Sequence, residues 1–324
     1  MEALARPAPR FPTLQVALLG ATVLTTLAVG TVLSPQAERL FSAEGLAEAW
    51  PVLPGALVEG LRFSAALIGI LLVHEMGHFV TARRHGVDVT WPYFIPVPFG
   101  VGTLGAVIKL RSPIPTRRAA LDIGASGPLA GFVVAIPILL WGLAHSEVKA
   151  AAELGAAQPF APAPLAMLWR VLHGEPALPA GSALLVFGDS LVLRAAQRLV
   201  LGELPPGSEV LIHPVGLAAW VGLLVTALNL IPIGQLDGGH VAYALLGGRR
   251  ARLVGRAASW ALLAAGLALT WSWLIWWALT RWLIGLRHPP PLVEEPRVGL
   301  GRALVAVASL AVLVGTFVPV PVSL

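Results

Sequence analysis

Six apolar runs, each long enough to cross a lipid bilayer, constrain this chain more than any other feature of its sequence. A membrane-spanning helix needs about 20 apolar residues. The runs are Phe11–Leu33, Phe63–Ala82, Ala119–Ala144, Pro214–Gly234, Ala257–Thr280 and Ala303–Val322. Composition agrees, because 56% of the residues are hydrophobic and only 12% are charged. We predict an all-α polytopic membrane protein with about six transmembrane helices.

We expect residues 1–324 to form a single integral membrane domain. Its core, residues 63–240, contains the polar motifs described below, and the flanking helices are 11–33, 257–280 and 303–322. The first run follows Arg6 and Arg10 and is too long for the apolar part of a signal peptide, so we interpret it as a retained anchor. No soluble stretch is long enough for a second folded module. The chain has no cysteine, which excludes disulfides and cysteine-ligated metals.

Basic residues lie in the short gaps between apolar runs, where they orient membrane proteins rather than bind nucleic acid. If the N-terminus is cytoplasmic, 12 basic residues fall on the inside: Arg6, Arg10, Arg83, Arg84, Lys109, Arg111, Arg117, Arg118, Arg249, Arg250, Arg252 and Arg256. The other 10 basic residues, including those between residues 281 and 302, fall on the outside. Four of these lie in the long 145–213 loop, and charges in long loops contribute little to membrane orientation. The comparison predicts a cytoplasmic N-terminus.

Two connections have patterns of their own. Residues 88–115 contain too many prolines and glycines for a helix, and "GTLGAVIKL" within them is typical of a strand or hairpin. We predict a small membrane-associated β-hairpin or re-entrant element there. In the long loop, Asp189 or Ser190 could cap a short interfacial helix on which Arg194 and Arg198 share one face.

Three polar residues interrupt the second apolar run, in the sequence "HEMGH". His74 and His78 are four residues apart, so a helix presents both imidazoles on one face to a single cation. Glu75 is rotated from that face, in the position of a general base for a metal-activated water. Ionisable groups within an apolar run are costly and indicate function.

A catalytic zinc needs a third protein ligand. Asp237 is the only acid in "TALNLIPIGQLDGGHVAYALLG", where Pro232 interrupts an apolar run. It could instead cap a helix at a membrane exit. Under the predicted topology Asp237 and His78 reach a similar depth near the cytoplasmic face, which favours His74, His78 and Asp237 as ligands. Two histidines and one carboxylate could also hold Fe²⁺.

These motifs closely resemble the site-2 protease family of intramembrane zinc metalloproteases. "HEMGH" is similar to the family's HExxH, "NLIPIGQLDGG" to its NxxPxxxLDG element, and "GASGPLAGF" to its GxxxN/S/G element through Gly127 and Gly131. "PYFIPVPF" and "RHPPP" extend the resemblance to the branch of plastid EGY-type proteases and their bacterial relatives, without a PDZ domain. The resemblance implies Zn²⁺ on His74, His78 and Asp237, Glu75 as general base, and Asn229 positioning or polarising the scissile carbonyl. Asn229 could instead make a helix–helix hydrogen bond.

The predicted function is therefore intramembrane proteolysis of a transmembrane protein substrate. The strand-like segment offers an edge to an unwound substrate, or it only shields the site. The glycines of 124–131 allow close helix contact or a water path. Competing hypotheses are a membrane metallohydrolase acting on lipid, a substrate-binding pseudoprotease, and a metal transporter. We expect a multi-pass protein of the bacterial cytoplasmic membrane, surrounded by lipid, with its active site near the cytoplasmic face; the sequence leaves any homo-oligomer undetermined.

Overall fold

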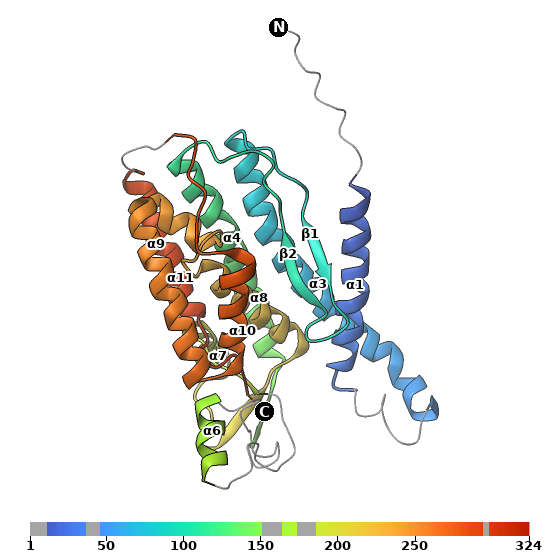
Figure 1. Ribbon diagram of the computed structural model, residues 1–324. Coiled ribbons are helices and arrows are strands. Elements are labelled where there is room, and N and C mark those ends of the chain that lie inside the picture. The colour runs from blue at the N-terminus through green and yellow to red at the C-terminus, as the bar shows by residue number, and fades with distance from the viewer. Residues whose placement is uncertain (1–11, 37–45, 151–163, 174–185, 294–297, 324) are drawn as a thin grey trace.

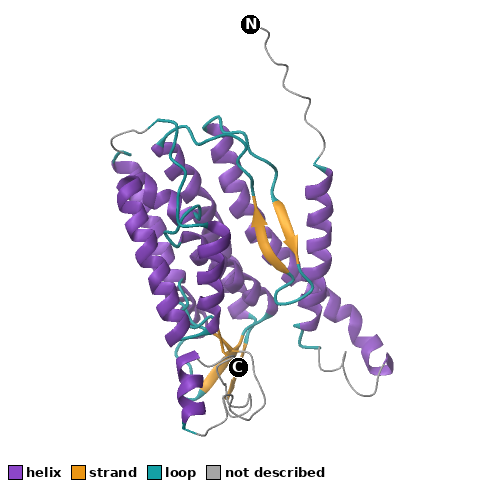
Figure 2. Ribbon diagram, viewed as in Figure 1, coloured by secondary structure: helices purple, strands orange, loops and turns teal. Residues whose placement is uncertain are grey.

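The computed structural model describes residues 12–36, 46–150, 164–173, 186–293 and 298–323 (Figure 1). Helices dominate this part of the chain and pack side by side, with three two-stranded sheets at the side and one end of the bundle (Figure 2). This arrangement agrees with the predicted all-α class.

Three helices are long and apolar enough to cross a membrane, and they correspond to the first three predicted runs. They are α1 (Thr13–Val32), α3 (Leu46–Arg84) and α4 (Arg117–Ala144). Two shorter apolar helices follow: α8 (Pro214–Leu230) lies within the fourth run, and α11 (Leu300–Thr316) begins just before the sixth run and overlaps most of it. The number of spans stays a prediction beyond the three long helices.

The fifth predicted run, Ala257–Thr280, is not one helix. It is divided between α9 (Asp237–Ala268) and α10 (Trp271–Ala278), and a short π-helical stretch, η1 (Leu279–Ile284), continues α10. Thr270 has an extended backbone, and its hydroxyl accepts a hydrogen bond from the Ser272 N–H, which starts a new helix. α10 then packs back against α9 (Figure 1).

This return changes where the following residues lie. The segment after η1 runs back to the N-terminal end of α4, where the Leu292 N–H donates to the Ile114 carbonyl at 3.0 Å. At the start of α11, Arg302 donates two hydrogen bonds of 2.8 Å to Asp122, which also contacts His85. Arg302 therefore lies at the same end of the bundle as the C-terminus of α3, and its predicted placement at the opposite end is wrong. The turn at Thr270 could not be predicted because the residues on both sides of it, within Ala257–Thr280, are predominantly apolar.

The predicted strand segment is confirmed as a hairpin. Strand β1 (Tyr93–Pro96) pairs antiparallel with β2 (Thr103–Val107), with Tyr93 opposite Val107. The turn docks on α1, where the Thr25 hydroxyl donates to the Gly102 carbonyl at 2.7 Å. β1 lies beside α1, and β2 lies on the side of the hairpin toward α8 (Figure 1).

The end of the bundle farthest from the N-terminus of α4 holds the remaining small elements. They are β3 (Glu147–Ala150) paired with β5 (Ser208–Leu211), β4 (Val186–Phe187) paired with β6 (Val322–Ser323), α6 (Pro164–Leu172) and α7 (Leu191–Leu201). The Ser190 hydroxyl accepts a hydrogen bond of 3.1 Å from the Leu193 N–H and caps α7. Of the two predicted cap residues, Asp189 and Ser190, it is therefore Ser190 that caps the helix. Parts of the long 145–213 loop lie outside the described residues.

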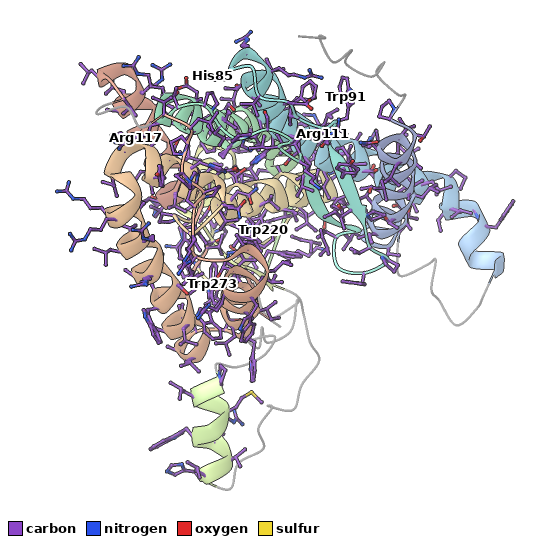
Figure 3. The ribbon with its side chains drawn as sticks, turned by 45° about the horizontal axis from the view of Figure 1, so that its top comes forward. His85, Trp91, Arg111, Arg117, Trp220 and Trp273 are labelled. Atoms are coloured by element: carbon purple, nitrogen blue, oxygen red, sulfur yellow. The ribbon has the colours of Figure 1, made fainter. Side chains whose placement is uncertain are left out.

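Polar side chains tie the helices together at both ends. Arg117 at the start of α4 is buried and donates from Nη2 and Nε to the Ala244 carbonyl of α9, at 2.7 and 3.1 Å. At the other end, the Trp220 indole donates to the Gly188 carbonyl and the Trp273 indole to the Pro319 carbonyl, at 2.9 and 2.7 Å. Figure 3 labels Arg117 and both tryptophans, well apart on the bundle. These bonds pair backbone carbonyls with the donors of buried side chains.

Candidate metal centre

Two buried histidines on α3 form one side of the site. His74 and His78 are 2% and 5% exposed, and their ring centroids are 5.0 Å apart. Apolar residues surround them on the helix, so α3 forms as a continuous span and carries both rings into the bundle on one face. The geometry expected from their spacing is present.

Asp237 comes to these histidines from a different part of the chain. α8 ends at Leu230, and Pro232 in the following turn prevents the helix from continuing. A sharp turn follows, and Asp237 is the first residue of α9. The N-cap residue is Leu236 and makes no side-chain cap bond, so the structure does not support Asp237 as a helix cap. Instead, its Oδ2 lies 3.3 Å from Nε2 of His74 and 3.3 Å from Nε2 of His78.

The donor atoms of these three residues fit a metal ion. All lie within 4.8 Å of one another, and within the described chain this is the one such cluster of histidine and acidic groups. Two ligands bound tetrahedrally at zinc distances are separated by about 3.3 Å. The start of α9 also favours a carboxylate, because a helix N-terminus carries partial positive charge.

A backbone carbonyl orients one of the imidazoles. The Ile123 carbonyl of α4 lies 2.7 Å from Nδ1 of His78. A carbonyl oxygen only accepts, so Nδ1 carries the proton and donates, and Nε2 keeps its lone pair for a cation. Such outer hydrogen bonds are typical of metal-binding histidines. The contact therefore holds the His78 ring in an orientation that suits a metal ligand.

The glycine motif of α4 lies directly against the two histidines. A Cβ at Gly127 would overlap the His78 ring, and one at Gly131 would come within 3.2 Å of Cβ and Nδ1 of His74. Of the two sequence interpretations, close helix contact and a water path, the structure supports close contact. The absence of side chains here leaves room for the imidazoles.

Glu75 and Asn229 face the same cavity as His74, His78 and Asp237. This cavity, of about 210 Å³, is lined by His74, Glu75, His78, Ala106, Val107, Ile108, Leu110, Ile123, Asn229, Gln235, Leu236, Asp237 and His240. Glu75 is 6% exposed, and Ile108 lines the cavity beside it. Nδ2 of Asn229 lies 3.4 Å from Nε2 of His74. The five sequence-predicted site residues are thus gathered at one place.

The same cavity is bordered by the hairpin. Ala106 and Val107 belong to β2 and Ile108 follows it, whereas no residue of β1 lines the cavity. β1 occupies only one edge of β2. The other edge has no strand partner in the described chain and lies beside Glu75.

Comparison of the sequence with known protein families identifies the family to which this chain belongs. The model of peptidase family M50 matches residues 62–273, which include the apolar half of α3, the hairpin, α4, α8 and all of α9. This chain belongs to peptidase family M50. The match confirms the resemblance to site-2 proteases that the motifs predicted.

Several curated plant proteins are similar to this M50 chain. It is 31% identical over 279 residues to an Arabidopsis thaliana protein named probable zinc metalloprotease EGY2, chloroplastic, covering 85% of this chain and 43% of that protein. It is 35% identical over 191 residues to EGY2 of Oryza sativa subsp. indica, and the match covers 59% of this chain and 29% of that protein. It is 31% identical over 267 residues to Arabidopsis EGY1, and the match covers 80% of this chain and 43% of that protein. The chain spans less than half the length of these relatives. No solved structure matches it.

The sequence did not identify every residue near this cavity. Nε2 of His288, to which no role was assigned, lies 2.6 Å from Nδ1 of His240 and its ring stacks on Tyr243. His240 itself lines the metal cavity, which supports its interpretation as a neighbour of the site over a residue at a membrane exit. The "RHPPP" motif was the available signal for His288. The Ile123 carbonyl gave no signal, since any residue type supplies one.

Proposed function

We propose that this chain is an intramembrane zinc endopeptidase that hydrolyses a peptide bond within or next to a transmembrane segment of a membrane protein. One observation carries the proposal: His74, His78 and Asp237 converge around a cavity that also contains buried Glu75 and the unpaired edge of β2. Family membership and the zinc metalloprotease names of the relatives support it. We take residues 1–324 as one domain.

When bound by the three ligands, zinc supplies Lewis acidity toward water and toward the carbonyl of the substrate. Glu75 accepts the proton of the attacking water and returns it to the departing amine. Burial of Glu75 keeps this exchange away from bulk solvent. The amide of Asn229 can donate to the oxygen on which negative charge develops, and it adds no charge inside the membrane.

A transmembrane helix hides its carbonyls in internal hydrogen bonds, so the substrate must become extended before attack. The free edge of β2 gives such a segment backbone partners beside Glu75. This role favours a peptide substrate over a lipid, which has no use for a strand edge. The intact Glu75 argues against a pseudoprotease. A transporter needs further ligands along a path, and the described residues contain one such cluster.

We also propose the placement in the membrane. About six spans and a hairpin dipping into the bilayer would put the metal centre near the face marked by Arg83 and Arg84, with the N-terminus on the same, cytoplasmic side. Because Arg302 lies at this end too, the charge bias is larger than the sequence count gave. A bacterial cytoplasmic membrane stays a prediction; the named relatives are chloroplastic.

Purified full-length protein tests the proposal in one experiment. We expect about one zinc per chain and cleavage of a reconstituted transmembrane peptide, with both lost in Asp237→Ala. Asp189→Ala is the matched control, since Asp189 forms an exposed ion pair with Arg194 at the other end of the bundle. Mass spectrometry of the lipids runs in parallel. Unchanged metal in Asp237→Ala would remove it as a ligand, and hydrolysed lipid without a cleaved peptide would support the lipid hydrolase instead.

A further inference from the structure

A second cavity, of about 500 Å³, lies between α9 and the end of η1, on the far side of the loop that precedes Asp237. Its lining contains four arginines together with Gln235, Ile284, Gly285 and Leu286. The arginines are Arg252 and Arg256 on α9, Arg281 in η1, and Arg287 just after it. We refer to these four as the arginine cluster.

No anion within the described residues balances the arginine cluster. The lining contains no carboxylate, and none of its four guanidinium groups has a hydrogen bond or ion pair to a described residue. Elsewhere, arginines do find acids: Arg62 pairs with Glu59, Arg194 with Asp189, and Arg302 with Asp122. Four like charges around one cavity repel one another and favour a bound anion, and guanidinium groups match phosphate in shape and charge.

The surface beside the cluster indicates what carries that anion. Leu253 and Val254 on α9 are 58% and 37% exposed, and Trp282 and Leu283 in η1 are 74% and 78% exposed. Each pair adjoins an arginine of the cluster in the sequence. An inorganic anion would make no use of these apolar side chains. Acyl chains would cover them while the head group meets the arginines, as in basic pockets between membrane helices on the cytoplasmic side.

We propose that the arginine cluster binds the phosphate of an anionic phospholipid, whose acyl chains lie along Leu253, Val254, Trp282 and Leu283. The return of α10 toward the N-terminal end of α4 makes the site, because it brings Arg281 and Arg287 to Arg252 and Arg256. Gln235 lines both this cavity and the metal cavity. A bound lipid would therefore contact the loop that positions Asp237. The binding site does not depend on the proposed protease activity.

Native mass spectrometry of the detergent-solubilised full chain tests this site, with phosphatidylglycerol as the probe and phosphatidylcholine as the zwitterionic comparison. Two double variants remove half of the cluster each: Arg252→Gln with Arg256→Gln, and Arg281→Gln with Arg287→Gln. Each should weaken phosphatidylglycerol binding by about tenfold or more. The matched control is Arg194→Gln with Arg198→Gln, two exposed arginines on α7, which should bind as wild type does.

Wild-type protein alone tests whether the cavity prefers an anionic phospholipid. Equal retention of phosphatidylglycerol and phosphatidylcholine would overturn the proposal. Displacement of the lipid by millimolar inorganic phosphate would identify a free-phosphate site, and displacement by a soluble acidic peptide would identify a polypeptide site. Either result contradicts a lipid site. Metal content and thermal midpoint establish that each variant is folded, and unchanged lipid binding in both folded double variants would also overturn the assignment.

Discussion

Gly127 on α4 lies so close to His78 on α3 that a methyl group on the glycine would overlap the imidazole at Nε2, Cδ2 and Cε1. This contact fixes how near the two helices pack and where the ligand ring lies. The ring is also held from its other nitrogen by the Ile123 carbonyl, so it has little room to move. The position of the proposed metal ligand His78 therefore depends on a residue without a side chain.

Gly127→Ala should therefore lower zinc occupancy, because the ring must rotate or the helices must separate. Overpacking of this kind costs roughly 1–3 kcal/mol in soluble cores. Elemental analysis of purified protein measures the effect. Gly69→Ala is the control: Gly69 lies on α3, the helix that carries His78, no atom lies within 4 Å of the added Cβ, and the variant should retain full occupancy. Full zinc occupancy in Gly127→Ala would show that the contact does not constrain His78.

Asn229→Ala separates the two roles considered for this amide. If Asn229 stabilises the developing oxyanion, kcat should fall by about 10²–10³ while the zinc content and thermal midpoint stay near wild type. Peptide cleavage kinetics and elemental analysis give the two readouts. A lowered thermal midpoint with unchanged kcat would instead indicate a helix–helix hydrogen bond. The 3.4 Å contact with His74 is compatible with both roles.

Cysteine crosslinking tests strand addition at β2, and the chain contains no cysteine of its own. Ala106 lines the metal cavity, whereas Ile95 on β1 does not. In a Glu75→Gln background, Ala106→Cys should form a disulfide with a cysteine placed next to the scissile bond of the substrate. Ile95→Cys should not. Equal crosslinking from both positions would show that the substrate does not lie along the free edge of β2.

Labelling with a membrane-impermeant maleimide tests the proposed orientation. Arg84→Cys and Arg250→Cys should react from the cytoplasmic side, because Arg84 ends α3 and Arg250 lies near the α9 carbonyl that Arg117 binds. Arg198→Cys on α7 should react only from the opposite side (Figure 1). The orientation would be wrong if Arg84→Cys reacted from the outside. If Arg84→Cys and Arg198→Cys reacted from the same side, the proposed spans would be wrong.

Much of the metal centre could be predicted because its chemistry depends on residue types that the sequence shows directly. Two histidines one turn apart define a direction on a helix, and an isolated acid at the same depth completes the set. The hairpin was also predictable from its glycines, prolines and β-branched residues. The membrane class followed from the lengths of the apolar runs. In each case the local pattern and the tertiary structure agree.

Other features depend on contacts between distant segments and so could not be predicted. The turn at Thr270 was missed because the residues on both sides are apolar, and the cap involves only one hydroxyl. The approach of His288 to His240 follows from that turn, since the chain must first return along α9. The role of Gly127 against His78 requires the distance between two helices. None of these has a signature within a short window of sequence.

The central claim is that Glu75 acts as the general base at a metal held by His74, His78 and Asp237. Its most direct test measures zinc content and peptide cleavage together in wild type and Glu75→Gln, reconstituted with one transmembrane substrate. We predict that Glu75→Gln keeps its zinc, because it is not a ligand, and loses cleavage by about 10²–10⁴. Cleavage at the wild-type rate by Glu75→Gln would contradict the account.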